Sequence, residues 1–147
     1  MKIFVAADHG GFELKNKIVD HLKRTHSGDE VIDVGPAVLD KNDDYPIKAY
    51  DVATKVLGED DARGILVCRS GQGMAMAANR VNGIRAAVVW TKEIAKETRE
   101  ANDSNVLSIA ADYLDDDWAE SIVDVWLETK FSGEERHLRR IKELEDL

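Results

Sequence analysis

The segment best suited to chemistry contains the single cysteine of the chain, Cys68. A short apolar run ends at this cysteine, and a glycine-rich turn leads from it into a helix-forming stretch. Such a turn presents unpaired backbone N–H groups and the positive end of a helix dipole to an oxyanion or a phosphate. We expect the same field to lower the pKa of a nearby thiol. The alternative is a small buried hydrophobe, since most cysteines at strand ends serve that purpose.

A second polar group follows the first apolar run of the chain. Asp8 and His9 stand there, directly before Gly10 and Gly11. A carboxylate and an imidazole at this point suit the binding of a sugar. Asp8 could equally cap the following helix while His9 faces solvent, and the local pattern leaves both interpretations open.

Two further places carry polar side chains later in the chain. Asn102 and Asp103 end a helical stretch, where they are either ligand contacts or ordinary helix-ending residues. Near the C-terminus, positive charge gathers on a face that either binds an anion or is simply solvated. Its members are Arg136, His137, Arg139 and Arg140.

Familiar motifs do not explain the cysteine loop. A P-loop requires a Gly-Lys-Ser/Thr ending, and no such lysine follows Cys68. A cysteine phosphatase needs an arginine six residues after the cysteine, where this chain has Met74. There is no second cysteine at metal-ligand spacing, and the four histidines are scattered. We therefore expect neither a nucleoside triphosphate site nor a metal site.

The apolar segments predict the fold that must position these residues. Each β-rich run is followed by a longer stretch with helical spacing, which predicts a parallel sheet with helices on both faces. Ligands of such sheets bind beyond the carboxyl ends of the strands. We expect one domain over residues 1–147, a three-layer α/β sandwich, with the tryptophans and with Met74 and Met76 in the core or an interface. The predicted strands are Lys2–Ala7, Glu30–Val34, Gly64–Val67, Ile84–Val89 and Asn105–Ile109.

Composition narrows the possible partners. The formal net charge of −9 and pI of about 4.9 argue against nucleic acid, because binding to its phosphates needs excess Lys and Arg. No stretch reaches the roughly 20 apolar residues that span a bilayer, and the N-terminus lacks the pattern of a signal peptide. With one cysteine and no disulfide, we expect a cytoplasmic protein.

Several motifs together resemble a known family. The sequences AADHGG, DVG, DYP, GILVCRSGQGMAMAANRVNGIRAA, NDSNVL and FSGEERHLRR occur in the order found in type B ribose-5-phosphate isomerases. This family also includes the galactose-6-phosphate isomerase subunits. The resemblance covers nearly the whole chain. It implies a flavodoxin-like five-stranded parallel sheet and a homodimer or dimer of dimers with shared active sites. It also implies isomerisation of a sugar phosphate through a cis-enediolate, without a cofactor.

The resemblance also assigns roles to individual residues. It makes Cys68 the base that moves a proton between C1 and C2, as in the branch of the family that lacks a glutamate at position 74. The loop from Arg69 to Gly73, with catalytic Ser70 and with Gly71 and Gln72, then stabilises the enediolate oxygen. The substrate-binding residues that it implies are Asp8, His9, Tyr45 and Asn102, with Arg136 and Arg140 holding the phosphate from a C-terminal helix, about 133–147, of the dimer partner.

Three positions depart from the family pattern. Ala101 replaces a histidine that opens the sugar ring, Asp112 replaces an arginine that contacts phosphate, and Arg69 replaces a small residue. A ring would then have to open spontaneously or with another group, such as His9 or His137, unless the substrate is a tetrose phosphate that cannot close one. Arg69 would compensate for the arginine missing at position 112.

The default substrates are ribose-5-phosphate and ribulose-5-phosphate, and another pentose, a tetrose or a hexose phosphate remains open. Two functions of other classes also remain at this point. One is a non-catalytic protein that binds sugar phosphates, and the other is a redox-sensing thiol.

Overall fold

The sheet of the computed structural model, which describes residues 1–147, has five parallel strands in the order β2-β1-β3-β5-β4. This confirms the predicted α/β architecture. The order exchanges the last two strands relative to the 2-1-3-4-5 order of flavodoxin. The strands are β1 (Lys2–Ala7), β2 (Glu30–Gly35), β3 (Ala62–Cys68), β4 (Ala86–Val88) and β5 (Val106–Ala110).

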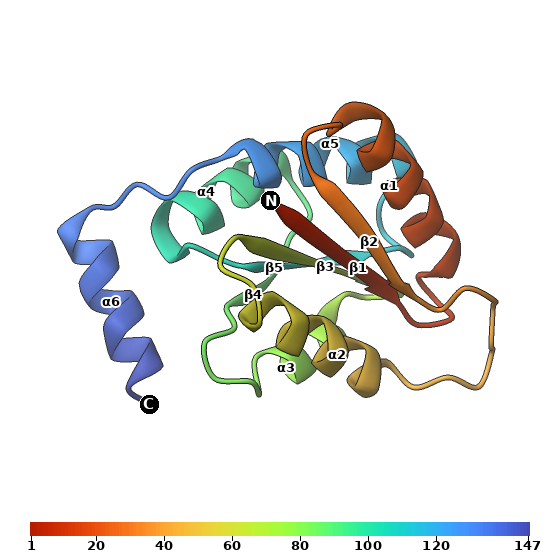
Figure 1. Cartoon of the computed structure of the whole chain (residues 1–147), viewed down its shortest axis with the longest axis horizontal. Coiled ribbons are helices and arrows are strands. Elements are labelled where there is room, and N and C mark those ends of the chain that lie inside the picture. The colour runs from red at the N-terminus through yellow and green to blue at the C-terminus, as the bar shows by residue number, and fades with distance from the viewer.

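Six helices follow the strands, and five of them form two layers on the sheet. In Figure 1, α1, α4 and α5 cover one face, α2 and α3 cover the other, and α6 stands apart beyond one end of the sheet. None of the helices is long and apolar enough to cross a bilayer. The helices are α1 (Phe12–Thr25), α2 (Tyr45–Leu57), α3 (Gln72–Ala78), α4 (Lys92–Asn102), α5 (Asp116–Glu128) and α6 (Glu135–Glu145).

Strand alternation divides the core into two clusters. In β1, Ile3 and Val5 join the cluster beneath α1 and α5, whereas Phe4 and Ala6 join the one beneath α2 and α3. A central strand of a parallel sheet is covered on both faces, which explains the nearly continuous apolar run. Trp126 and Met74 are fully buried, as predicted. Trp90, Trp118 and Met76 are exposed, so they do not join the core, and their place in an interface stays a prediction.

Helix α6 is poorly covered by its own chain. Its only buried side chain is His137, while Leu138 and Leu144 are both more than half exposed. In the space-filling view, hydrophobic, basic and acidic side chains lie side by side at the left end of the molecule, where Figure 1 places α6. The helix therefore presents an apolar and charged surface with no partner in this chain.

The connection from β1 to α1 packs closely against β3. A Cβ atom added to Gly11 would lie 2.2 Å from the carbonyl oxygen of Val67, so no larger residue fits between the two segments. This contact brings the end of β1 against the end of β3. It therefore sets the distance between Asp8 and Cys68, the residues that follow or end these strands.

We predict that Gly11→Ala destabilises the protein by roughly 1–3 kcal/mol, the usual cost of forcing an extra carbon into a packed site. Urea unfolding followed by circular dichroism measures the change. Gly28→Ala is the matched control, because a Cβ there meets nothing within 4 Å. Equal stabilities for the two variants would contradict the close packing.

Candidate active site

The carboxyl ends of β1, β3 and β5 bring most of the predicted site residues to one edge of the sheet. Asp8 and His9 follow β1, Cys68 ends β3, and Asp112 lies two residues beyond β5. Backbone hydrogen bonds fix this arrangement, since the N–H of Asp8 donates to Val67 and that of Asp112 donates to Arg69. The edge is the ligand-binding end of an open α/β sheet.

The side chain of Cys68 lies at this edge, on the face of the sheet that α2 and α3 cover. Its side chain is buried, and its sulfur accepts a hydrogen bond of 3.1 Å from the backbone N–H of Gly71. Gly71 has a φ of +74°, a conformation that favours glycine, and it caps the start of α3. Ser108 of β5 donates to the Gly71 carbonyl at 2.6 Å, so the turn is fixed from below.

The pKa of the Cys68 thiol is raised, so the expectation of a lowered pKa was wrong. Burial is the main cause, and the nearby carboxylate of Asp8 adds to it. The backbone N–H groups of Gly71, Met74 and Ser70 act in the opposite direction and do not compensate. The guanidinium of the neighbouring Arg69 turns to Asp112.

The redox alternative fits this environment poorly. Oxidant-sensing thiols are exposed and have lowered pKa values. The Cys68 side chain is only 5% exposed and its pKa is raised.

Backbone donors above the cysteine remain free. The N–H of Gln72 donates weakly to the Ser70 hydroxyl at 3.4 Å, whereas the N–H groups of Ser70 and Gly73 have no acceptor in the chain. Two unpaired N–H groups beside a buried sulfur are suited to stabilise an oxyanion. The loop therefore has the donors that the sequence predicted.

Asp8 holds the turn that follows β1. One oxygen of its buried carboxylate accepts hydrogen bonds from the N–H groups of Gly10 at 3.0 Å and Gly11 at 3.2 Å. Both interactions lie before α1, whose first turn receives no side-chain cap. Asp8 is therefore not an ordinary helix cap. The Asp8 carboxylate therefore lies near Cys68, at the carboxyl edge of the sheet.

His9 is held by Asp43, a residue that the sequence analysis missed. One Asp43 oxygen accepts from the His9 backbone N–H at 2.8 Å and lies 2.9 Å from His9 Nδ1. This contact raises the pKa of His9, which favours the imidazolium. The other Asp43 oxygen is buried and has no hydrogen-bond partner. Asp43 directly precedes the DYP motif, but no local pattern links it to His9.

Two side chains border the loop from opposite sides. The ring of Tyr45 covers Gly73, where an added Cβ would lie 2.7 Å from it. Arg69 crosses Gly10, and its Nε donates to Asp112 Oδ2 at 3.0 Å. The terminal nitrogens of this guanidinium have no acceptor, and the side chain is 69% exposed. A cationic group is thus present at the mouth of the site.

A cavity of about 650 Å³ adjoins the loop. Ser70 and Gln72 line it, and so do the exposed aromatic residues Trp90, Tyr113 and Trp118. Its size suits a small organic ligand.

Three predicted residues lie at the other end of the molecule. Asn102 ends α4 before β5 begins, whereas Cys68 pairs with Ala110 at the end of β5. The five residues of β5 separate them by roughly 13 Å of strand. Arg136 and Arg140 lie on α6, which Figure 1 places beyond this same amino end. One chain therefore does not bring Asn102 or these arginines to Cys68.

The carboxyl edge of the parallel sheet carries a buried cysteine beneath free N–H groups, together with a carboxylate and an imidazole. These features indicate the class of protein: an α/β enzyme whose small substrate develops negative charge during the reaction. Comparison with known proteins makes this class specific. A family model described as Ribose/Galactose Isomerase matches residues 3–144.

Individual relatives agree over the whole length. The chain is 42% identical to the probable ribose-5-phosphate isomerase B of Mycoplasma genitalium, covering 97% of this chain and 92% of that protein. It is 39% identical to the putative sugar phosphate isomerase YwlF of Bacillus subtilis, with coverages of 99% and 96%.

Solved structures have the same fold. The ribose-5-phosphate isomerase B of M. genitalium with bound ribulose-5-phosphate superposes with a TM-score of 0.92 at 40% identity, covering 99% of this chain and 94% of that one. The Clostridium thermocellum enzyme gives 0.93 at 41% identity, with coverages of 99% and 96%.

The chain belongs to the ribose/galactose isomerase family. It is an aldose–ketose isomerase of sugar phosphates, which is an intramolecular oxidoreductase.

We predict that Asp8→Asn lowers the pKa of Cys68, because it removes a negative charge that disfavours the thiolate and keeps the oxygen that binds the turn. The pH dependence of alkylation by iodoacetamide reports this pKa directly, since the chain has one cysteine. Asp112→Asn is the control, because Asp112 is paired with Arg69 and does not act on the thiol. A pKa that is unchanged or higher in Asp8→Asn would contradict the assignment.

Proposed function

We propose that the chain interconverts ribose-5-phosphate and ribulose-5-phosphate, with Cys68 as the base. The observation that carries this proposal is the hydrogen bond from Gly71 N–H to the buried Cys68 sulfur, beneath the free N–H groups of Ser70 and Gly73. A base and a set of oxyanion donors at one point are the two requirements for removing a proton next to a carbonyl. The solved M. genitalium relative contains ribulose-5-phosphate, which supports the choice of substrate.

The reaction follows from these two groups. The thiolate of Cys68 takes the proton from C2 of the open-chain aldose, and the electron pair forms a C1=C2 double bond. Negative charge develops on O1, where the N–H groups of the loop stabilise it. The O2 hydroxyl then passes its proton to O1, and the sulfur returns its proton to C1 as O2 becomes the ketone oxygen. The reaction through the cis-enediolate only moves protons within the sugar, so it needs no external oxidant or reductant.

The raised pKa of Cys68 affects this chemistry in two ways. The thiolate is scarcer near neutral pH, but it is a stronger base once it forms. Because only the thiolate can act as the base, we expect kcat/KM to increase as the pH rises above neutrality, until the thiol has ionised.

We further propose that each active site is shared between two copies of the chain, in a dimer or a dimer of dimers. Asn102, Arg136 and Arg140 lie too far from Cys68 of their own chain to serve it. A second copy brings its own Asn102 and α6 to the cysteine edge, as a two-fold arrangement requires reciprocally. The uncovered surface of α6, with Leu138 and Leu144 exposed, is consistent with packing against a second chain.

The terminal arginines then hold the phosphate from across the interface. Arg136 and Arg140 are both exposed on α6, and Arg136 Nε lies 2.8 Å from the carboxylate of Glu134. Guanidinium groups bind phosphate through two parallel hydrogen bonds, which suits them to this task.

His9 is the residue that we assign to ring opening in place of the histidine absent at Ala101. Asp43 fixes its Nδ1, so the Nε2 side of the ring remains for a substrate. His137, the other candidate, is buried and its Nδ1 lies 2.8 Å from the Ser132 hydroxyl. A tetrose phosphate is the second candidate substrate, since Ala101 cannot transfer a proton and a tetrose phosphated on O4 needs no ring opening.

We predict that the wild-type chain isomerises at least one of four sugar phosphates and that Cys68→Ala loses this activity. The panel is ribose-5-phosphate, erythrose-4-phosphate, allose-6-phosphate and galactose-6-phosphate, in a coupled isomerase assay. Met76→Ala is the control, because this exposed residue lies on the same helix α3 and away from the loop. Faster turnover of ribose-5-phosphate than of the tetrose supports the pentose, and the reverse order favours the tetrose. An active Cys68→Ala would refute the role of the base.

Arg69 supplies a positive charge that the family pattern places at position 112. The observed ion pair with Asp112 holds its guanidinium at that position, with free donors directed outward. We predict that Arg69→Gly raises KM by about tenfold or more with little change in kcat, since hydrogen bonds to charged groups contribute roughly 1.5–3 kcal/mol. Steady-state kinetics measure this. Arg80→Gly, an exposed arginine with no ion pair, is the control, and an unchanged KM in Arg69→Gly would rule out the role.

A further inference from the structure

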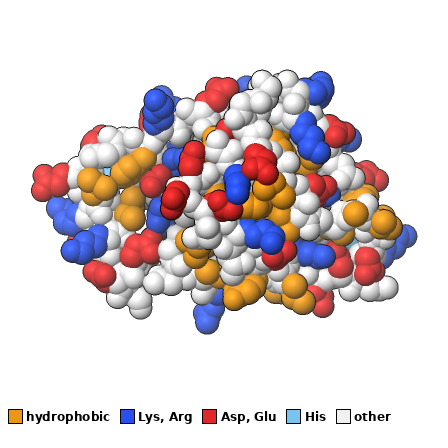
Figure 2. All heavy atoms as spheres, viewed as in Figure 1, with side chains coloured by type: hydrophobic (Ala, Val, Ile, Leu, Met, Phe, Trp, Pro, Cys, Tyr) orange, Lys and Arg blue, Asp and Glu red, His pale blue; other side chains and the backbone are white.

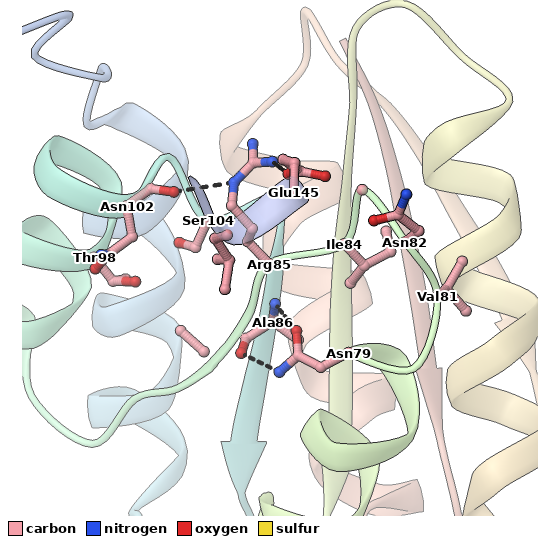
Figure 3. Close-up of a pocket in the computed structure, with 13 residues that line it drawn as sticks. Asn79, Val81, Asn82, Ile84, Arg85, Ala86, Thr98, Asn102, Ser104 and Glu145 are labelled. Atoms are coloured by element: carbon pink, nitrogen blue, oxygen red, sulfur yellow. Dashed lines mark hydrogen bonds and ion pairs between the residues drawn. The ribbon is translucent and has the colours of Figure 1, made fainter. Parts of the chain in front are cut away.

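The stretch Asn79–Ala87 contains none of the site residues assigned above, although it is among the most distinctive motifs of the sequence. In the structure it connects α3 to β4 at the amino end of the sheet. Together with the end of α4 and the last turn of α6 it surrounds a cavity of about 490 Å³ (Figure 3). Asn102 lies on the rim of this cavity, and so does Glu145 of α6.

Arg85 joins the two elements that carry the second half of the site. Its Nε donates to the carbonyl oxygens of Asn102 at 3.0 Å and Asp103 at 3.1 Å. Its Nη2 donates to the same Asp103 carbonyl at 3.0 Å, and its Nη1 donates to Glu145 Oε1 at 2.5 Å. Figure 3 shows the guanidinium between Asn102 and Glu145. One side chain thus fastens the end of α4 and the end of α6 to each other.

The backbone around Arg85 is itself held by two asparagines. Asn79 exchanges two hydrogen bonds with Ala86, donating to its carbonyl at 2.9 Å and accepting from its N–H at 2.7 Å. Asn105 accepts from the Arg85 N–H and donates to the Gly83 carbonyl, both at 2.8 Å. The Arg85 side chain therefore extends from a backbone segment that these four hydrogen bonds hold in place.

Few other contacts fix α6. Near its start, the buried His137 lies 2.8 Å from the Ser132 hydroxyl, and the arginines of α6 pair only with nearby glutamates. At its far end, the Arg85–Glu145 pair is the one ion pair between α6 and another element. Just before α6, the N–H of Ser132 donates to the Glu100 carbonyl of α4 at 3.2 Å. Arg85 therefore holds the far end of α6, and this hydrogen bond holds the segment that precedes the helix.

We propose that Arg85 is a positioning residue that holds Asn102 and the α6 arginines as one unit, which each chain supplies to the Cys68 of its partner. This inference rests on the shared site proposed above. Arg85 itself contacts neither the Cys68 loop nor any residue of the carboxyl edge. Its loss should therefore damage only the half of the site that its own chain donates.

We predict that Arg85→Met lowers kcat/KM by about tenfold or more, and that Arg85→Lys recovers part of the loss because an ammonium still reaches some of the acceptors. Glu145→Gln weakens only the link to α6 and so should raise KM more than it lowers kcat. Arg80→Met is the matched control in the same stretch, since Arg80 is exposed and unpaired. Thermal unfolding of each variant separates lost positioning from lost folding.

Mixed dimers provide the decisive experiment. Cys68→Ala and Arg85→Met chains are dissociated, combined in equal amounts and allowed to reassociate. In each hybrid, one site has an intact Cys68 from the Arg85→Met chain and an intact donated half from the Cys68→Ala chain. Half of the dimers are hybrids with one working site each, so activity should recover to about a quarter of wild type.

A control mixture of Cys68→Ala with Asn102→Ala identifies which proposal fails. Recovery in both mixtures supports the role of Arg85. Recovery in the control alone would overturn it, because Arg85 would then be needed by the chain that supplies the cysteine. Recovery in neither mixture would overturn the shared site itself, and with it the inference that depends on it.

Discussion

The parallel pairing of β3 with β5 determines which residues of this chain can meet. Cys68 pairs with Ala110 at the carboxyl ends of these strands, whereas Asn102 lies shortly before the amino end of β5. Because all five strands point the same way, every residue that follows a strand gathers at one edge and every residue that precedes a strand gathers at the other. The groups proposed for proton transfer lie at the first edge. The amide and the arginines proposed to hold the substrate lie at the second, so in the proposed dimer one chain carries two half-sites that face away from each other.

Local electrostatics allow a chain with a net charge of −9 to serve an anionic substrate. At the carboxyl edge, each cation is held by a carboxylate: His9 by Asp43 and Arg69 by Asp112. The pairs orient the cations and leave their outer donors free. Cys68 lies beneath them in a buried position that raises its pKa, so the proposed base is scarce as a thiolate but strong once formed. In the proposed mechanism, the backbone N–H groups of the loop, which carry no formal charge, are the main stabilisation available to the enediolate oxygen.

The sequence predicted the architecture because alternation of apolar strands and amphipathic helices is a local pattern. It also located the Cys68 loop and Asp8, since both directly follow strands. It did not predict the pKa of Cys68, which depends on how much water burial removes, a property of the packed structure. Nor did it find Asp43, because a contact with His9 across 34 residues has no local signature. Trp90 and Trp118 were placed in the core or an interface on residue type alone, and in the structure they border an open cavity.

A crystal structure of the Cys68→Ala variant with ribulose-5-phosphate would test the central claim most directly. The account predicts that the sugar carbons lie against position 68 and the loop from Ser70 to Gly73 of one protomer. Its phosphate should contact Arg136 and Arg140 of a second protomer, with Asn102 of that protomer beside the sugar. A ligand bound entirely within one chain, or one bound at the amino end of the sheet away from position 68, would contradict it.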